Sequence, residues 1–283
     1  MATQSDRLEN CAQMVAKAPR IVCFTGAGMS AESGIDTFRG GSGLWSGALG
    51  YIVLGWFGTP VGWKWTPDFA WSKYIDQFYN PIRDAQPNDG HRALVDLQTI
   101  HPDLCIITQN VDGLHQEAGS NPDRVFEVHG TVRRSRCIKN GHIYDFEGNT
   151  NLPRKSPTCR VDGCRSKLRP DCVLFTEGIP NREWMRAEFA TRQLGSGDVM
   201  IIVGTSAQVY PAASLPEIAF ERGATLIDVN LERMRSAPPR NYEYLGGTAA
   251  TTLPELVRRV GQIRNASVSN VEDITKSSLH NEH

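Results

Sequence analysis

Residues 20–40, RIVCFTGAGMSAESGIDTFRG, decide the fold of this chain. The segment opens with a short apolar run rich in β-branched residues, which is typical of a buried parallel strand. It then turns at Gly26, Ala27 and Gly28 toward the start of a helix. Gly26 permits a sharp turn, and Gly28 lets the backbone approach a pyrophosphate, whose oxygens would bind free N–H groups of the helix start. The glycines alone are equally typical of a simple turn, so the prediction of a dinucleotide site depends on the residues after them.

Composition limits the function. The chain has 283 residues, with 30 Lys and Arg against 31 Asp and Glu, so we expect neither direct nucleic-acid binding nor a membrane-surface role. No run approaches the ~18 apolar residues of a membrane span, and the N-terminus lacks a signal-peptide pattern. Four of the seven cysteines lie in apolar helix or strand contexts, which predicts buried thiols in a reducing compartment. We therefore expect an intracellular, cytoplasmic protein.

Polar side chains follow two further predicted strands. Residues 104–108 form the first, and Gln109, Asn110 and Asp112 come directly after it. Because two amides and a carboxylate in four residues are costly to bury without partners, a site is a better interpretation than a plain polar loop. The second strand, residues 124–128, delivers His129. A lone histidine is more often packed or exposed than catalytic, but the carboxyl end of a parallel strand is where ligands bind.

The rest of the chain alternates helices and strands. This pattern predicts an α/β fold, with a Rossmann-like parallel sheet and helices on both of its faces. We assign residues 1–45, 88–130 and 169–264 to a large, dinucleotide-binding domain. A helical insert, 46–87, and a second insert, 131–168, are assigned to a small domain. Residues 265–283 are polar and rich in Ser and Asn, so we expect a disordered tail.

Several motifs resemble the sirtuin (Sir2) family of NAD-dependent protein lysine deacylases. Residues 26–39 are similar to the family motif GAGxSxxSGIxxFR, with Asp36 where proline is usual, and residues 108–115 to TQNxDxLH. Residues 169–177 resemble the substrate-edge segment RPxVVxFGE, with Thr176 in place of glycine. The resemblance covers about residues 20–260, and in the family the pair matching His129 and Gly130 carries the general base.

This resemblance implies a reaction. NAD would be the co-substrate and an acyl-lysine protein or peptide the substrate, giving nicotinamide, O-acyl-ADP-ribose and free lysine, with His129, Asn110 and Asp112 in catalysis. The implied cofactor-binding residues are Gly26, Ala27, Gly28, Ser30, Ile35, Phe38, Arg39, Gln109, Asn110, Asp112, Gly204, Thr205, Ser206, Asn230 and Ala249. The implied substrate-binding residues are Gly58, Tyr74, Phe175, Glu177 and Val209.

The family also holds a structural zinc ion with two cysteine pairs in the second insert. Here Cys137, Cys159 and Cys164 match, but Asn140 stands where the first pair should end, and His142 is the nearest alternative ligand. A closed four-ligand site suits a small insert that lacks its own core. We therefore predict a zinc-ribbon-like module over residues 131–168, in which the three cysteines bind zinc and His142 is the candidate for the fourth ligand. The alternative is a module that has lost its metal.

The acyl preference depends on two positions. Residues 58–60, GTP, resemble the ATP segment of sirtuins that accept long acidic acyl groups, which also carry Tyr-x-x-Arg. Here Gln77 stands three residues after Tyr74, where the arginine should be, and Arg83 lies four residues after Tyr79, one place too late. Succinyl recognition therefore lacks a bidentate cation. We expect deacetylation or removal of other neutral acyl groups. The alternatives are a desuccinylase or demalonylase, an ADP-ribosyltransferase or NAD hydrolase, and a non-catalytic sensor of NAD or ADP-ribose.

Overall fold

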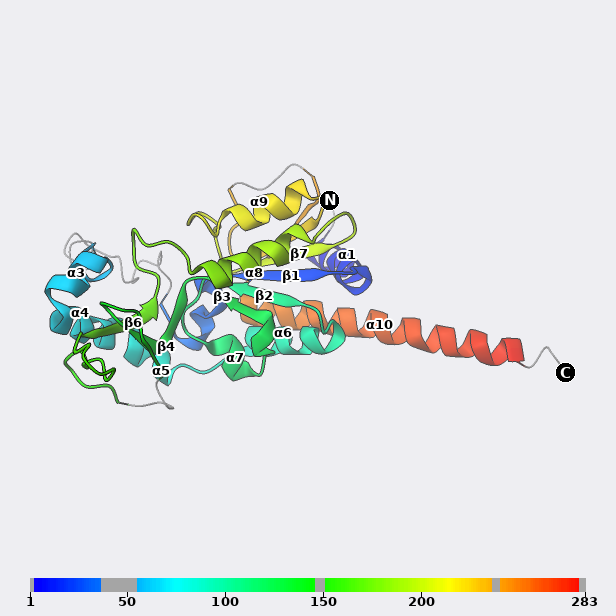
Figure 1. Ribbon diagram of the computed structural model, residues 1–283. Coiled ribbons are helices and arrows are strands. Elements are labelled where there is room, and N and C mark those ends of the chain that lie inside the picture. The colour runs from blue at the N-terminus through cyan, green and yellow to red at the C-terminus, as the bar shows by residue number, and fades with distance from the viewer. Residues whose placement is uncertain (1–2, 37–54, 146–150, 236–239, 280–283) are drawn as a thin grey trace.

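A six-stranded parallel sheet is the centre of the computed structural model, which describes residues 3–36, 55–145, 151–235 and 240–279 (Figure 1). The strand order is β3-β2-β1-β7-β8-β9. The strands are β1 (Ile21–Thr25), β2 (Cys105–Thr108), β3 (Val125–Glu127), β7 (Val199–Val203), β8 (Thr225–Asn230) and β9 (Tyr242–Gly246). All five pairings are parallel. The predicted α/β fold is therefore confirmed.

Helices cover both faces of this sheet. One face packs against α1 (Gln4–Lys17), α6 (Asp89–Ile100) and α10 (Ala249–Leu279), and the other against α8 (Asn181–Arg192) and α9 (Ser214–Glu221). Successive side chains of β1 point to opposite faces of the sheet. Ile21 and Cys23 therefore belong to the core under the first set of helices, and Val22 and Phe24 to the core under the second. Every residue of β1, β2 and β7 is buried, as expected for a sheet covered on both faces.

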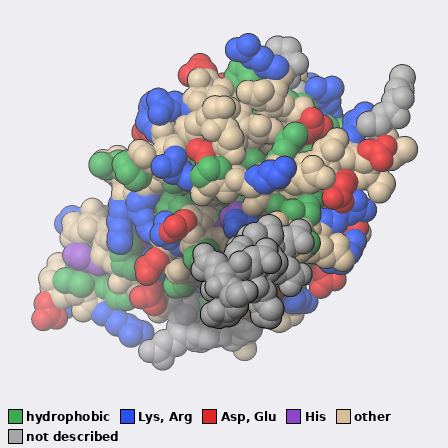
Figure 2. All heavy atoms as spheres, turned by 90° about the vertical axis from the view of Figure 1, so that its right-hand side faces the viewer, with side chains coloured by type: hydrophobic (Ala, Val, Ile, Leu, Met, Phe, Trp, Pro, Cys, Tyr) green, Lys and Arg blue, Asp and Glu red, His purple; other side chains and the backbone are tan. Residues whose placement is uncertain are grey.

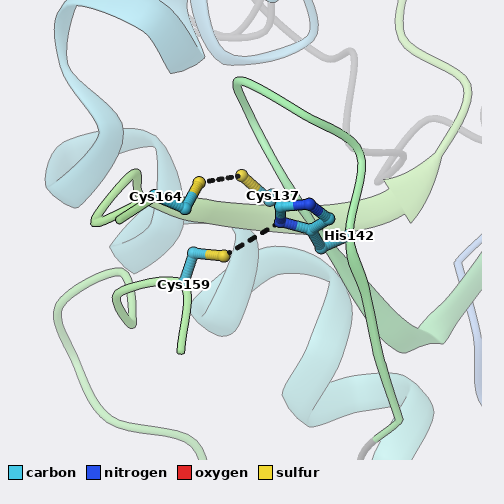
Figure 3. Close-up of side chains that lie close together, drawn as sticks. All are labelled: Cys137, His142, Cys159 and Cys164. Atoms are coloured by element: carbon cyan, nitrogen blue, oxygen red, sulfur yellow. Dashed lines mark hydrogen bonds between the residues drawn. The ribbon is translucent and has the colours of Figure 1, made fainter. Parts of the chain in front are cut away.

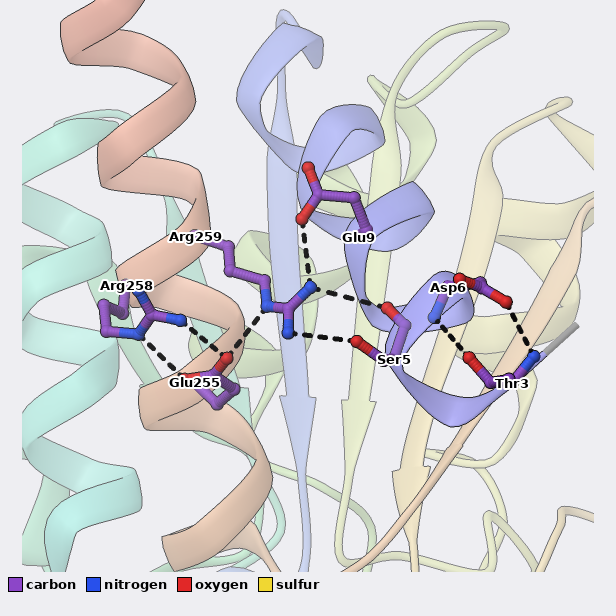
Figure 4. A network of polar contacts seen from close by, with 7 residues as sticks. All are labelled: Thr3, Ser5, Asp6, Glu9, Glu255, Arg258 and Arg259. Atoms are coloured by element: carbon purple, nitrogen blue, oxygen red, sulfur yellow. Dashed lines mark hydrogen bonds and ion pairs between the residues drawn. The ribbon is translucent and has the colours of Figure 1, made fainter.

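Polar side chains fix how α10 lies against α1. Arg259 donates hydrogen bonds to Glu9 (3.0 Å) on α1 and to Glu255 (2.9 Å) one turn earlier on its own helix (Figure 4). Thr3 and Asp6 form a capping box that begins α1 beside this contact. Helices α1 and α10, the first and last of the described helices, are thereby joined on the first face of the sheet.

A second, smaller sheet lies to one side of the main sheet. Its strands β4 (Gly130–Cys137), β5 (Ile143–Asp145) and β6 (Leu168–Cys172) pair antiparallel in the order β5-β4-β6. The helical segment α3 (Pro60–Trp65), α4 (Pro67–Tyr74), the π-helical turn Ile75–Tyr79 and α5 (Asn80–Asp84) shares a third core with this sheet. Since β6 pairs with β4, the small sheet extends past residue 169, where we expected the large domain to resume.

Two details differ from the expectations. Helix α10 continues to Leu279 through residues 265–279, a segment without Pro or Gly, where we expected a disordered tail; Figure 1 shows it projecting from the body. The helix start expected after Gly28 is only two short 3₁₀ turns, η1 (Ala27–Met29) and η2 (Ala31–Ser33), because Gly34 ends the second with φ +83°.

The charge pattern agrees with the composition. The face turned toward the projecting end of α10 carries basic and acidic side chains interspersed over its visible area (Figure 2). None of the described helices is long and apolar enough to span a membrane.

Candidate active site and metal centre

The glycine turn after β1 packs directly on the turn after β7. Gly28 donates its N–H to the carbonyl oxygen of Gly204 (2.8 Å), and a Cβ added at Gly28 would lie 2.7 Å from the Gly204 Cα. Gly204 itself has φ +61°. Because β1 lies between β2 and β7, this contact marks the point where the strand order reverses, which is where open α/β sheets bind ligands. The two turns thus pack main chain against main chain at this edge of the sheet, which leaves no room for a side chain at either glycine.

Three predicted site residues meet beside these two turns in one buried cluster. Ser30 donates to the Asp112 carboxylate (Oγ–Oδ2 2.7 Å), and Asn110 donates from Nδ2 to Ser30 Oγ and to the Gly26 carbonyl oxygen, both at 3.0 Å. Leu114 N–H donates to the other Asp112 oxygen (2.9 Å). Since Asn110 uses its nitrogen on protein acceptors, its carbonyl oxygen can accept from a ligand amide. Burial raises the pKa of Asp112, and the Leu114 and Ser30 hydrogen bonds oppose that rise.

The tautomer of His129 follows from its main-chain partner. Its Nδ1 lies 3.0 Å from the carbonyl oxygen of Gln109, which can only accept, so Nδ1 carries the proton and Nε2 presents a lone pair. Burial lowers the pKa of His129, partly opposed by this hydrogen bond, so the ring is neutral at pH 7. Gln109 also donates to Thr205 Oγ1 (2.9 Å), joining the ends of β2 and β7. The arrangement positions a neutral imidazole that can accept a proton.

Other predicted cofactor residues are spread along the same sheet edge. Asn230 ends β8 and donates to the carbonyl oxygen of Thr205 (3.3 Å), Ser206 is exposed, and Ala249 begins α10 in the core. Ile35 packs against the core of the small sheet. Two further predicted contacts lie outside the described residues: Phe38 and Arg39.

On the substrate side, the structure separates the predicted residues into two groups. Phe175 and Val209 are 51% and 54% exposed, and Phe175 N–H donates to the Gly58 carbonyl oxygen (2.8 Å). Glu177 accepts two hydrogen bonds from one Arg169 nitrogen (2.7 and 2.9 Å). Tyr74 is different, because it is only 3% exposed and packs in the third core. Its place is that of a core residue.

Thr176 has the positive φ that glycine readily adopts, and glycine is the residue usual at this position of the family motif. Its φ is +75°, in the left-handed region that favours glycine and is unfavourable for a β-branched residue. Strain of this kind costs about 1–3 kcal/mol and persists where the surroundings determine the turn. Here the Leu174 N–H donates to Glu177 (3.0 Å), so the loop closes on itself around Thr176.

Several residues that the sequence analysis missed support this site. Arg133 donates from Nε to the carbonyl oxygen of Asp112 (2.8 Å) and pairs with Glu117. Burial raises the pKa of Glu127, two residues before His129, to about 7. His115 lies 3.1 Å from Thr25 Oγ1, beneath the cluster. His115 is the last residue of the motif over residues 108–115, whereas the signal for Arg133 and Glu127 was only their closeness to motif residues.

The second site is a cluster of sulfur and nitrogen ligands in the small sheet. Cys137, His142, Cys159 and Cys164 place their ligand atoms within 4.8 Å of one another (Figure 3). The Cys137 and Cys164 sulfurs are 3.5 Å apart, and His142 Nδ1 is 3.3 Å from Cys159 Sγ. Tetrahedral zinc with Zn–S bonds of about 2.3 Å needs ligand atoms about 3.8 Å apart. The donor set therefore fits zinc, with His142 offering the fourth ligand atom.

A tight turn brings His142 to the cysteines. Gly141 has φ +68° and donates to the carbonyl oxygen of Cys137 (2.9 Å), while Cys137 N–H donates to the carbonyl oxygen of His142 (2.8 Å). Asn140 supports the cluster from outside, because its Nδ2 donates to Cys164 Sγ (3.4 Å). Tyr144 OH lies 3.0 Å from Cys159 Sγ. Such outer contacts orient metal ligands.

Comparisons with known proteins agree with this geometry. The sequence profile of the Sir2 family matches residues 26–211. An NAD-dependent protein deacylase of Thermococcus kodakarensis is 40% identical over 265 residues, covering 90% of this chain and 96% of the relative. One of Mycolicibacterium paratuberculosis is 39% identical over 251 residues, covering 87% and 100%.

Solved structures agree as well. A Sir2 homologue in complex with ADP-ribose superimposes with a TM-score of 0.79 at 36% identity, covering 90% of this chain and 97% of its own. A Sir2 homologue in complex with NAD gives 0.78 at 36%, covering 90% and 94%. A Sir2 protein with a deacetylated peptide and 3′-O-acetyl-ADP-ribose gives 0.72 at 28%, covering 90% and 97%.

The fold and the two sites define a dinucleotide-binding α/β protein with an attached metal-binding module. Within that class, the chain belongs to the Sir2 family.

Proposed function

We propose that this protein is an NAD-dependent protein lysine deacylase that removes acetyl and other neutral acyl groups. The observation that carries the proposal is the tautomer of His129. Its Nδ1 is held by the Gln109 carbonyl oxygen, so Nε2 can accept a proton beside the Ser30–Asn110–Asp112 cluster. A neutral base with a pKa near or below that of free histidine is suited to accepting a hydroxyl proton at neutral pH.

The residues at the strand ends fit NAD. The turns after β1 and β7 meet at Gly28 and Gly204, at the edge of the sheet where open α/β folds bind ligands, and Asn110 offers an amide oxygen beside them. When bound, NAD supplies a ribose carbon that becomes electrophilic as nicotinamide leaves. Asp112 supplies a carboxylate for the positive charge that develops there, in a buried setting that excludes water. His129 then takes the proton of a ribose hydroxyl.

The substrate loop supports a peptide substrate. Residues 173–177 follow β6 at one side of the small sheet. The N–H groups of Val173 and Phe175 already donate to the carbonyl oxygens of His129 and Gly58, so an extended peptide would add to this segment by donating to its carbonyl oxygens. Because Thr176 keeps a glycine-like φ, the loop retains the turn that glycine would make. The presence of Thr176 in place of glycine therefore does not favour the alternative function, an ADP-ribosyltransferase or NAD hydrolase that uses no acyl peptide.

The small domain favours neutral acyl groups. Arg83 is bound to Asp84 through two hydrogen bonds (2.8 Å each) and donates to Asn151 (2.8 Å). The Tyr74 hydroxyl donates to the Val132 carbonyl oxygen (2.9 Å). To bind Arg83 or Tyr74, a succinyl carboxylate would first have to break these contacts. Arg83 therefore does not offer the free bidentate cation that would favour a succinyl group over a neutral one.

The experiment is product analysis by mass spectrometry. The protein is incubated with NAD and a matched set of acetyl-, butyryl-, succinyl- and myristoyl-lysine peptides. We expect O-acyl-ADP-ribose and free lysine together, with acetyl or butyryl faster than succinyl. Consumption of NAD without change in any peptide would instead establish an ADP-ribosyltransferase or NAD hydrolase. Binding of ADP-ribose with no product of either kind would establish a sensor.

A further inference from the structure

A buried carboxylate lies behind the end of β8. Asp228 is fully buried, two residues before Asn230. One of its oxygens accepts a hydrogen bond from Asn230 Nδ2, and the other accepts from Met234 N–H (2.9 Å) and from the Tyr242 hydroxyl. A carboxylate is costly to bury, and these three donors offset that cost.

These contacts determine which way the Asn230 amide faces. Its nitrogen lies between the Asp228 carboxylate and the carbonyl oxygen of Thr205, at 3.3 Å from the latter. Both neighbours can only accept hydrogen bonds, so the amide nitrogen must point toward them and both of its protons are used. The amide oxygen is then left on the side away from Asp228. Within the described residues, that oxygen accepts none of the hydrogen bonds of the structure.

We propose that Asp228 is a positioning residue for the adenosine half of NAD, which orients Asn230 so that the ligand meets an acceptor. A group that binds to the Asn230 amide oxygen must donate a hydrogen bond. A free ribose hydroxyl can donate one, but the same position cannot once the hydroxyl carries a phosphate. Asp228 thereby selects a dinucleotide with a free hydroxyl over its phosphorylated form. This inference rests on the proposed function, because it takes Asn230 as a contact of NAD.

The surroundings keep this arrangement rigid. Asp228 joins β8 to the start of the following loop through Met234 and to β9 through Tyr242. The Arg233 guanidinium lies 4.8 Å from the Tyr242 ring centre, and Tyr244 donates to the main-chain oxygens of Asn230 (3.2 Å) and Leu231 (2.9 Å). The main chain of Asn230 is therefore held independently of its side chain, so a change at Asp228 can alter the amide without displacing the strand end.

The test is a double-mutant cycle on the Kd of ADP-ribose, measured by calorimetry on the full chain. We expect Asp228→Asn and Asn230→Ala each to weaken binding about tenfold, the equivalent of about 1.4 kcal/mol for one oriented hydrogen bond. The double variant should bind no more weakly than Asn230→Ala alone, because Asp228 acts through Asn230. Asp228→Asn should also reduce the preference for ADP-ribose over 2′-phospho-ADP-ribose, a change that a merely structural role would not produce.

The matched control is Tyr242→Phe, which removes another partner of Asp228 and leaves the Asn230 contact. It should lower the Tm while the Kd of ADP-ribose stays within about twofold of wild type. Equal losses from Asp228→Asn in the wild-type and Asn230→Ala backgrounds would overturn the inference. If Asp228→Asn does not fold, Asp228→Ser replaces it in the same cycle, and equal losses in the two backgrounds would again overturn the proposal. Failure of the wild type to bind ADP-ribose would refute the proposed function itself.

Discussion

The cluster at the strand ends and the cysteine–histidine cluster are held by the chain in different ways. Ser30, Asn110 and Asp112 hydrogen-bond to one another and to the main chain, at the ends of strands that are buried along their whole length. The thiols of the second cluster mainly face one another and His142, on short strands and turns. The first cluster is preorganised by the core, whereas the second has its natural partner in a metal ion. Loss of a ligand should therefore affect the two regions very differently.

The largest expected effect is loss of the metal. In small zinc-dependent folds, the metal contributes about 10–16 kcal/mol of apparent binding free energy to folding at pH 7. We expect His142→Ala to lose stoichiometric zinc, measured by elemental mass spectrometry, and hydrogen exchange to increase in β4–β6 but not in β1, β2 or β7.

The matched control for that experiment is Asn140→Ala. Asn140 lies beside the cluster and donates to Cys164, so its removal should leave one zinc per chain. If Asn140→Ala loses the metal and His142→Ala keeps it, the ligand assignment is wrong. If neither loses it, the comparison between the two clusters fails.

The next effect concerns the preorganised site. His129→Ala should reduce kcat for deacylation about 10²–10⁴-fold, because a general base is lost. The Kd of ADP-ribose should change little, since the Ser30–Asn110–Asp112 cluster does not include the histidine. In the wild type, kcat/KM should fall as His129 becomes protonated, at a pH below its ordinary pKa of 6.5. Full activity of His129→Ala would contradict the mechanism.

A smaller effect should appear in the pH dependence of stability. Burial lowers the pKa of His91, which lies below the active-site cluster against His115, from 6.5 to about 4. The unfolded chain therefore binds a proton first, so the free energy of unfolding should fall as the pH drops from 6.5 toward 4. One pKa unit corresponds to about 1.4 kcal/mol, so His91 alone should account for roughly 3 kcal/mol.

Urea denaturation at several pH values measures this slope. The variant His91→Gln cannot titrate, so its stability should depend less steeply on pH over the same interval. An unchanged slope would show that His91 keeps its ordinary pKa in the folded chain.

The smallest expected effect comes from Tyr74→Phe. The variant leaves the Val132 carbonyl oxygen without its hydroxyl donor, which should cost about 1–2 kcal/mol of stability. The ranking of acetyl, butyryl and succinyl peptides should not change, because the hydroxyl is bound within the core. A changed ranking would place Tyr74 in the acyl site after all.

Parts of both sites could be predicted from the sequence, for different reasons. Ser30, Asn110, Asp112 and His129 come after apolar β-branched runs, and parallel strands bring their carboxyl ends to one edge. His142 could be proposed because few other side chains near Cys137 can bind zinc. The role of Asp228 could not be predicted, because its position within a strand pattern does not distinguish it from its neighbours. Its partner Tyr242 comes from β9 and is brought to it only by the fold.

The sequence by itself determined the parallel α/β fold, the glycine turn and the identity of the polar groups at the strand ends, since these depend on local periodicity and on residue type. Only the tertiary structure decided that Tyr74 is a core residue whose hydroxyl donates to Val132, and that Arg83 donates to Asn151. It also decided the direction of the Asn230 amide. The physical reason is that a side chain's partners come from distant segments, so its role depends on which acceptors and donors the fold brings within hydrogen-bond distance.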